Sequence, residues 1–259
     1  MFERKPLVVT GMHRSGTSLV AQVLVAAGVD LGVDRSPASR DGGGGSPERK
    51  GHFEDKRFVA LHERVIQRFD SSGRLLWEPD GPLAPDEAEI GEARGLVEAR
   101  SSASPWGWKD PRTVLFLDFW AELLPEAVFL FVFRRPEHVV DSLRRRGDRE
   151  LLQGVGALAR FRYGRAIRAW SDYNQRLLDF VEAHPTRSCL FEIDTFVEDP
   201  TPILDCVRSH LGIPLDPVDL LAIYDPALTG RQPHPRVMRS VGKSSDAARL
   251  YERLRSAAE

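Results

Sequence analysis

The sequence predicts an α/β fold, a three-layer structure in which a central parallel sheet is flanked by helices on both faces. Three observations carry this prediction. Strand patterns alternate with helical patterns along the chain. The segment at 128–134, VFLFVFR, is apolar at successive positions, as in a central strand buried on both faces. A glycine-bearing loop joins the first strand to the first helix, which is the arrangement of a P-loop-like fold. We expect one domain over residues 1–259.

The first half of the chain begins with a short buried strand at residues 7–10. Apolar residues at helical spacing then predict a helix at 16–27, and Gly28 fits its end. The segment at 34–53 is rich in Gly, Ser and Pro, and we expect a mobile surface loop there, either a lid or a simple excursion. Two further helices are predicted at 54–69 and 85–103.

The second half starts with a short strand at 106–112 that Pro111 interrupts, followed by the strand at 128–134. Pro136 suits the first turn of the next helix. The remaining elements are a long helix at 155–183, a strand at 188–193, and short helices alternating with turns from 199 onward, including a C-terminal helical segment at 215–259.

Composition limits the functional class. The 259 residues are 42% hydrophobic and 29% charged, as in a globular protein, and the net charge of −2 excludes a general polyanion binder. Any anion site must therefore come from local clustering of the 36 Lys and Arg residues. With only Cys189 and Cys206 we expect buried, reduced thiols. The first residues show no secretory signal, and no apolar run approaches the roughly 20 residues of a membrane span, so we expect a cytoplasmic protein.

The first candidate anion site is the loop GMHRSGTS, residues 11–18, called the anion loop below. Gly11 and Gly16 have the spacing of a phosphate-binding loop, but Thr17 stands where such a loop has its lysine. Amides at the start of the following helix, together with its dipole, favour an anion. The alternative is an ordinary strand-to-helix turn. The residues expected to bind the anion are Arg14, Ser15, Gly16, Thr17 and Ser18.

A metal ion is not expected at this loop. In P-loop nucleoside triphosphatases Mg²⁺ is held by a loop Ser or Thr and a downstream Asp. Here the strand at 128–134 ends in arginines, and Asp194 is the only weak candidate. The sequence therefore favours an anion bound without a metal.

The second candidate anion site follows the strand at 128–134. Arg134 stands at its carboxyl end, where parallel sheets bind ligands, and Ser142 lies about two turns along the next helix. The alternative is a solvated basic patch, which we accept for residues 144–146.

The two motifs together resemble the sulfotransferases that use 3′-phosphoadenosine 5′-phosphosulfate (PAPS). In that family a loop like HRSGTS binds the 5′-phosphosulfate, and a segment like RRPEHVVDS, with Arg134 and Ser142, binds the 3′-phosphate. The segments GMHRSGTSL and WGWKDPR look most like the bacterial branch, which is related to the tyrosylprotein and some carbohydrate enzymes. The resemblance runs from about residue 6 to 215. The late Gly-rich basic motif of the cytosolic branch is missing, and Arg236, Arg239 and Lys243 stand in its place.

The resemblance implies a PAPS-dependent sulfotransferase with Arg14, Glu54 and Lys109 as catalytic residues. Glu54 would be the general base, with His52 as its rival and a helix cap as its alternative role. Lys109 would assist transfer, and its alternative is a lysine held by Asp110 at a turn. His13 is expected to shape the loop.

Two other functions stay open. One is a small-molecule kinase using ATP and Mg²⁺, and the other is a non-catalytic nucleotide-binding module. The acceptor stays open among small molecules, carbohydrates and lipids, we expect no nucleic-acid partner, and the oligomeric state is not predicted.

Overall fold

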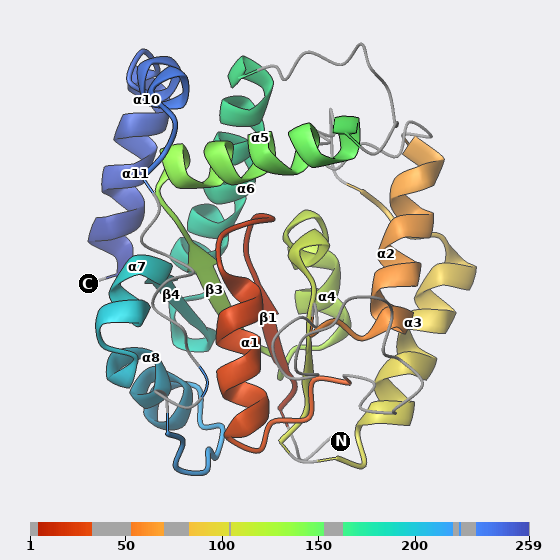
Figure 1. The fold of residues 1–259 in the computed structure, drawn as a ribbon. Helices are drawn as coiled ribbons and strands as arrows, with labels where there is room; N and C mark the ends of the chain where they lie inside the picture. Colours follow the sequence, from red (N-terminus) through yellow and green to blue (C-terminus); the bar gives the residue numbers. More distant parts are fainter. Residues whose placement is uncertain are drawn as a thin grey trace.

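The computed structural model describes residues 5–32, 53–69, 83–103, 105–152, 163–219, 223 and 232–258. A four-stranded parallel sheet lies at its centre, in the order β2-β1-β3-β4 (Figure 1). The predicted α/β class is confirmed. The strands are β1 (Leu7–Thr10), β2 (Gly107–Lys109), β3 (Val128–Phe133) and β4 (Ser188–Glu192).

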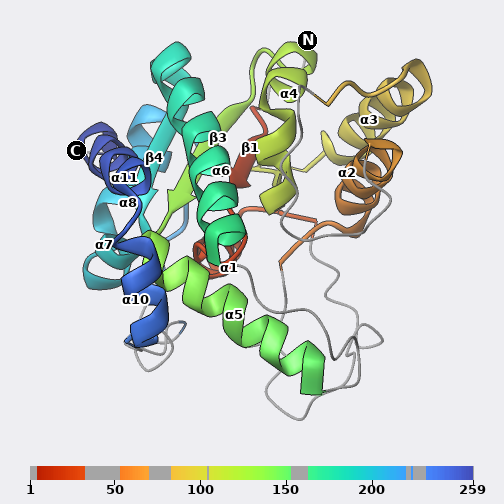
Figure 2. The same cartoon turned by 90° about the horizontal axis from the view of Figure 1, so that it is seen from above.

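Helices cover both faces of the sheet (Figures 1 and 2). The α-helices are α1 (Thr17–Ala26), α2 (Lys56–Phe69), α3 (Glu87–Arg100), α4 (Leu117–Leu123), α5 (Pro136–Leu152), α6 (Tyr163–Ala183), α7 (Ile193–Glu198), α8 (Thr201–Asp205), α10 (Pro235–Val241) and α11 (Ser245–Ala258). Two short 3₁₀ helices are η3 (Pro111–Phe116) and η4 (Pro185–Arg187), and η5 (Cys206–His210) is a π-helical turn.

The side chains of β3 point alternately to the two faces of the sheet, and this alternation explains why helices pack on both faces. Its valine and leucine residues at 128, 130 and 132 belong to a core with α1, α7 and α8, which lie in front of the sheet in Figure 1. Its three phenylalanines, at 129, 131 and 133, belong to a second core with α4, α6 and α11. A strand with apolar side chains on both faces needs such cover on both sides.

Most predicted elements are confirmed, and two differ. The strand expected at 106–112 ends at Lys109, because the side chain of Asp110 accepts the amide of Arg112 and caps the turn η3, which begins at Pro111. The long helix expected from 155 is described from Tyr163, and residues 155–162 lie outside the described part. The loop expected at 34–53 also lies there, apart from Phe53.

The strand order indicates where a ligand would bind. From β1 the chain goes to β2 on one side, and β3 then pairs with the other side of β1. Such a reversal is the topological switch point of an open parallel sheet, and ligands bind outside the carboxyl ends of the strands there. The anion loop follows β1, Lys109 ends β2, and Arg134 follows β3, so all three reach this edge.

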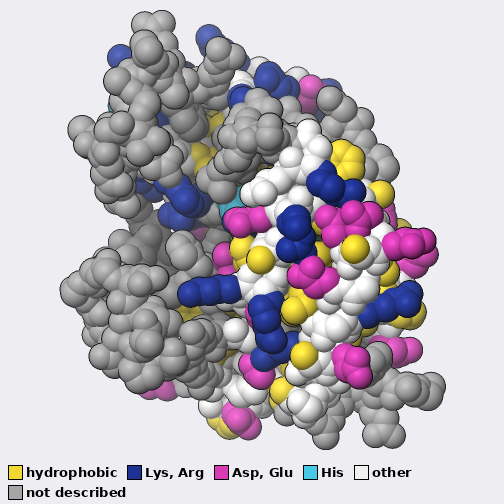
Figure 3. All heavy atoms as spheres, turned by 90° about the vertical axis from the view of Figure 1, so that its right-hand side faces the viewer, with side chains coloured by type: hydrophobic (Ala, Val, Ile, Leu, Met, Phe, Trp, Pro, Cys, Tyr) yellow, Lys and Arg dark blue, Asp and Glu magenta, His cyan; other side chains and the backbone are white. Residues whose placement is uncertain are grey.

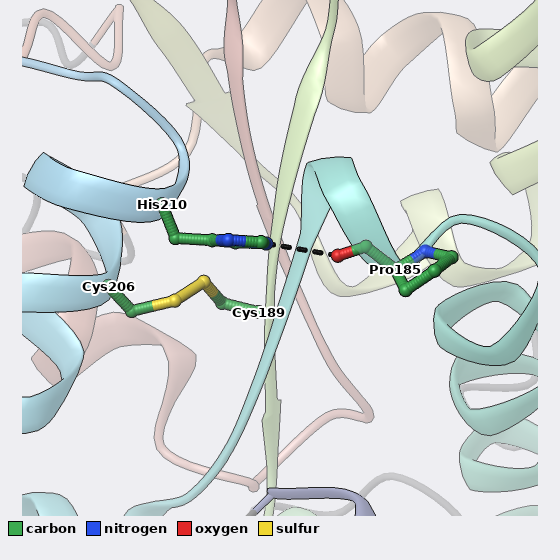
Figure 4. The surroundings of a disulfide bond; sticks show 4 residues. All are labelled: Pro185, Cys189, Cys206 and His210. Atoms are coloured by element: carbon green, nitrogen blue, oxygen red, sulfur yellow. Dashed lines mark hydrogen bonds between the residues drawn. A yellow bond between two sulfur atoms is a disulfide. The ribbon is translucent and has the colours of Figure 1, made fainter.

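The expectation of two reduced thiols was wrong. Cys189 on β4 and Cys206 at the start of η5 form a disulfide (Figure 4). Both cysteines belong to or pack against the core formed with α1, α7 and α8. Beside them, His210 lies 2.9 Å from the carbonyl oxygen of Pro185. A count of two cysteines had suggested no framework, but it says nothing of their distance in the fold.

The face over α2 and α3 carries charges of both signs (Figure 3). Arg64 pairs with Glu92, and Arg68 lies 2.7 Å from Glu89. This face therefore does not attract a polyanion.

None of the helices in the described ranges is long and apolar enough to span a bilayer.

Candidate active site

The backbone of the anion loop adopts the left-handed region twice. Arg14 has φ of 74° and Gly16 has φ of 91°. An arginine in this region is strained by about 1 kcal/mol or more, and such strain concentrates at functional sites. Left-handed residues alternating with right-handed ones form a concave run of amide groups that suits an anion.

Neither of the two loop glycines could be replaced by a residue with a side chain, because there is no space for a Cβ atom. A Cβ at Gly11 would collide with the carbonyl oxygen of Val132 in β3, and one at Gly16 would collide with the side chain of Ile193. The loop is thus pressed against the ends of β3 and β4. This packing fixes the start of α1, whose first amides have no partner within the helix.

The buried hydroxyl of Ser15 fits a ligand at this loop. Ser15 is fully buried, and its Oγ has no hydrogen-bond partner among the described residues. A buried hydroxyl without a partner is costly, and an anion oxygen would satisfy it. Thr17 and Ser18 lie in the first turn of α1, where the helix dipole also favours an anion.

The two predicted anion motifs meet. Arg14 donates from Nε to the hydroxyl oxygen of Ser142 at 2.9 Å, across 128 residues of sequence. Ser142 lies on α5 and is buried. An anion bound in the anion loop and one bound near Ser142 would therefore share one neighbourhood.

Arg134 lies at the end of β3 in a mostly buried setting, with its side chain 14% exposed. Its Nε is 3.7 Å from Asp194, and its Nη2 is 3.4 Å from His138. Trp170 donates to its backbone oxygen at 3.0 Å. Asp194, the weak metal candidate, thus lies against a guanidinium. Burial, and then the charge of Arg134, lower the pKa of His138.

Three predicted residues form a cluster at the end of β2. Lys109 donates to Oε1 of Glu54 at 2.7 Å and to Oγ of Ser18 at 3.3 Å. Lys109 is 1% exposed and the Glu54 side chain 21%. Burial lowers the pKa of Lys109, and the charge of Glu54 offsets part of this effect. The ammonium therefore bridges a carboxylate and the first helical turn behind the anion loop.

The geometry opposes the two structural alternatives, a helix cap for Glu54 and a turn contact with Asp110 for Lys109, and the catalytic roles of both residues stay predictions. Asp55, not Glu54, caps α2, because its Oδ1 accepts the amide of Arg57 at 3.0 Å. Lys109 is held by Glu54 rather than by Asp110, whose Oδ2 lies 2.7 Å from Nδ1 of His62. The rival base His52 lies outside the described residues.

His13 lies in the anion loop beside Tyr173, with ring centroids 6.5 Å apart. Burial, together with the charges of Arg112 and Lys109, lowers the pKa of His13 to about 3. The imidazole is therefore neutral at physiological pH and adds no positive charge to the loop.

Sequence reasoning missed a group of polar residues behind Lys109. Asp110 is fully buried, and Arg112 donates to it from Nη1 at 2.9 Å. The same Nη1 lies 3.9 Å from Oε2 of Glu54. Position 62, a histidine on the apolar face of a helix that also buries Phe58 and Val65, was the one signal available.

The basic residues proposed for the late motif lie on or just after α10. Arg236, Arg239 and Lys243 are all exposed. The segment is tied to α5 by the amide of His234, which donates to Asp141 at 3.3 Å. These residues lie on an element packed beside the one that carries Ser142, and their role stays a prediction.

Comparison with known proteins identifies a family match. The model of the sulfotransferase family matches residues 6–217. The sulfotransferase domain from the curacin biosynthetic pathway is similar in structure, with a TM-score of 0.53, 16% identity, and cover of 97% of this chain and 98% of that one. Sulfotransferase STF9 from Mycobacterium avium gives a TM-score of 0.56 and 15% identity, over 98% of this chain and 76% of that one. No curated protein matches.

Proposed function

The chain belongs to the sulfotransferase family and is a sulfuryl-transferring enzyme, and we propose that PAPS is its donor. The acceptor would be a hydroxyl or amine of a small molecule, carbohydrate or lipid, and transfer would be an in-line displacement without a metal. Nucleotide binding would use Arg14, Ser15, Gly16, Thr17, Ser18, Arg134 and Ser142.

The observation that carries this proposal is the contact of Lys109 with Ser18. In P-loop kinases the Ser or Thr at this place holds Mg²⁺. Here a buried ammonium lies 3.3 Å from that hydroxyl. A sulfuryl group carries one negative charge fewer than a terminal phosphoryl group. A side-chain cation in place of a divalent ion therefore matches the smaller charge.

PAPS would supply the sulfuryl group, and the residues of the chain would bind and orient this donor. Arg14 and the amides of the anion loop neutralise the charge that develops on the 5′-phosphate side. Arg134 and Ser142 hold the second phosphate. Because Ser142 also accepts a hydrogen bond from Arg14, the residues that would contact the two ends of the donor are themselves hydrogen-bonded to each other.

Glu54 would take the proton of the acceptor. Its Oε1 is bound to Lys109, and its Oε2 lies 3.9 Å from Arg112. The carboxylate is still 21% exposed, so an acceptor hydroxyl can approach it. Lys109 reaches both Glu54 and Ser18, so it links the place of proton removal to the place of charge development.

The test is a calorimetric comparison of nucleotides. We expect adenosine 3′,5′-bisphosphate (PAP) to bind with equal affinity with and without Mg²⁺, and ATP to bind more weakly under both conditions. Tighter ATP binding that depends on Mg²⁺ would support the kinase alternative. PAP binding with no sulfuryl transfer to any member of a broad acceptor panel would support a non-catalytic module.

We further propose that the enzyme works in the cytoplasm. Cell fractionation followed by immunoblotting tests this location, and we expect the protein in the cytosolic fraction. Recovery of most of the protein in the medium or in a membrane fraction would oppose it.

A further inference from the structure

Behind the Lys109–Glu54 pair runs a buried chain of hydrogen bonds that donor binding does not use. Trp120 on α4 donates from Nε1 to Nε2 of His62 at 2.8 Å. Nδ1 of His62, on α2, lies 2.7 Å from Oδ2 of Asp110. All three side chains are 1% exposed or less. Burying charged and polar groups this deeply costs free energy, so we expect these residues to serve a function.

The proton positions follow from chemistry. An indole N–H can only donate, so Nε2 of His62 must accept and carries no proton. The proton is therefore on Nδ1, and a neutral imidazole donates to Asp110. Burial alone would raise the pKa of Asp110, but the hydrogen bond from His62 and the charge of Arg112 lower it well below its usual value. Asp110 is a buried carboxylate.

The other oxygen of Asp110 orients Arg112. Oδ1 accepts from the amide of Arg112 at 3.0 Å and from its Nη1 at 2.9 Å. The guanidinium is 18% exposed, and its Nη2 donates to Glu63 at 2.6 Å. With both ends fixed, the guanidinium presents Nη1 toward Glu54. Asp110 also adjoins Lys109 in the chain, and its carbonyl accepts from Thr10, at the entrance of the anion loop, at 2.8 Å.

We propose that the chain Trp120–His62–Asp110–Arg112 positions the carboxylate of Glu54 for proton removal. Asp110 fixes Arg112 on one side of Glu54 and the backbone of Lys109 on the other. A buried ion pair contributes little stability compared with an apolar core of equal volume, which favours positioning as its role. The inference rests on the proposed base role of Glu54.

A matched pair of tryptophans gives the test. Trp120→Phe removes the N–H that fixes the proton of His62 but keeps an aromatic ring. Trp106→Phe is the control, because Trp106 is 1% exposed in the same core and its Nε1 has no hydrogen-bond partner among the described residues. We expect Trp120→Phe to lower kcat roughly tenfold, with KM for PAPS unchanged, and Trp106→Phe to lower neither. Equal kcat for the two variants would overturn the proposal.

A second pair decides the matter if Trp120→Phe does not fold. His62→Asn keeps a nitrogen donor near the place of Nδ1, whereas His62→Phe keeps a ring but has no donor. We expect His62→Asn to retain several-fold more kcat than His62→Phe. If both lose equally, the histidine has only a packing role.

Glu54→Ala separates this inference from the proposed function. If Glu54→Ala leaves turnover near that of the wild type, the base assignment fails, and the positioning proposal fails with it. If Glu54→Ala is inactive but the tryptophan and histidine pairs show no difference, only the positioning proposal is wrong.

Discussion

Replacing Glu54 with Gln should separate catalysis from donor binding. The change keeps the shape of the side chain but removes its charge and its ability to accept a proton. The distances predict two effects, because Glu54 is both the proposed base and the carboxylate 2.7 Å from the buried Lys109.

The catalytic effect follows from general-base catalysis, which contributes about 10²–10⁴-fold. We expect kcat to fall by about 10²-fold or more, which corresponds to about 2.7 kcal/mol or more. The affinity for PAP should stay within about twofold, since the pairs Arg14–Ser142 and Arg134–Asp194, at the proposed anion sites, do not include Glu54.

The stability effect follows from the burial of Lys109. Removing one partner of a buried ion pair costs about 3–5 kcal/mol. Because Glu54 is 21% exposed, we expect about 2–3 kcal/mol for Glu54→Gln. Adding Lys109→Met should recover part of this loss, giving a coupling energy of about 1–3 kcal/mol in the double-mutant cycle.

The assays are transfer of a radiolabelled sulfuryl group from PAPS to an acceptor panel, calorimetric PAP binding, and urea unfolding. Glu92→Gln is the matched control, because Glu92 on α3 also pairs with an arginine, Arg64, but its side chain is 43% exposed and lies outside the proposed site. We expect near-normal turnover for this control. A Glu54→Gln enzyme within about threefold of wild-type kcat would refute the reasoning, as would equal losses in the two variants.

Three further changes test the donor site and the fold. Arg134→Ala should weaken PAP binding by about 1.5–3 kcal/mol, while Arg135→Ala, the neighbouring and half-exposed control, should not; equal effects would oppose the site. For His13, the folded pKa of about 3 lies below the unfolded value of about 6.5, so its contribution is fully present above pH 6.5 and is lost as pH falls toward 3. Stability by urea unfolding should therefore drop less between pH 7 and 5 in His13→Asn than in the wild type, and identical drops would contradict this pKa. Changing Cys189 and Cys206 to Ala should cost about 3 kcal/mol of stability in an oxidised sample, and no change in melting temperature would show that the bridge contributes nothing.

The fold was predictable because its signals are local and repeated. The segment VFLFVF has apolar side chains at every position, as is typical of a short strand covered on both faces. The anion loop was predictable from the spacing of Gly11 and Gly16, since both positions exclude a Cβ. Family resemblance then selected Glu54 and Lys109, and the structure brings them within 2.7 Å.

The contacts that could not be predicted join residues that are far apart in the sequence and close only in the folded chain. His62 and Asp110 are 48 residues apart, and nothing in either local pattern says that they meet. The bond between Cys189 and Cys206 likewise depends on how η5 packs against β4. Asp55 took the capping role because it directly precedes α2, whereas Glu54 lies one residue earlier and turns to Lys109.

The pairing of the site cations bears on selectivity for the donor. Arg14 and Arg134 follow the ends of β1 and β3, and Lys109 is the last residue of β2. Each of these cations already has a polar partner, which is Ser142, Asp194 and Glu54 respectively. A ligand with a single anionic end would have to compete with these partners for one cation, so its net gain is small. A ligand that is anionic at both ends reaches the anion loop and Arg134 together, and the second contact then forms without a further loss of translational freedom. On this argument, removing the 3′-phosphate should cost more affinity than one charged hydrogen bond alone.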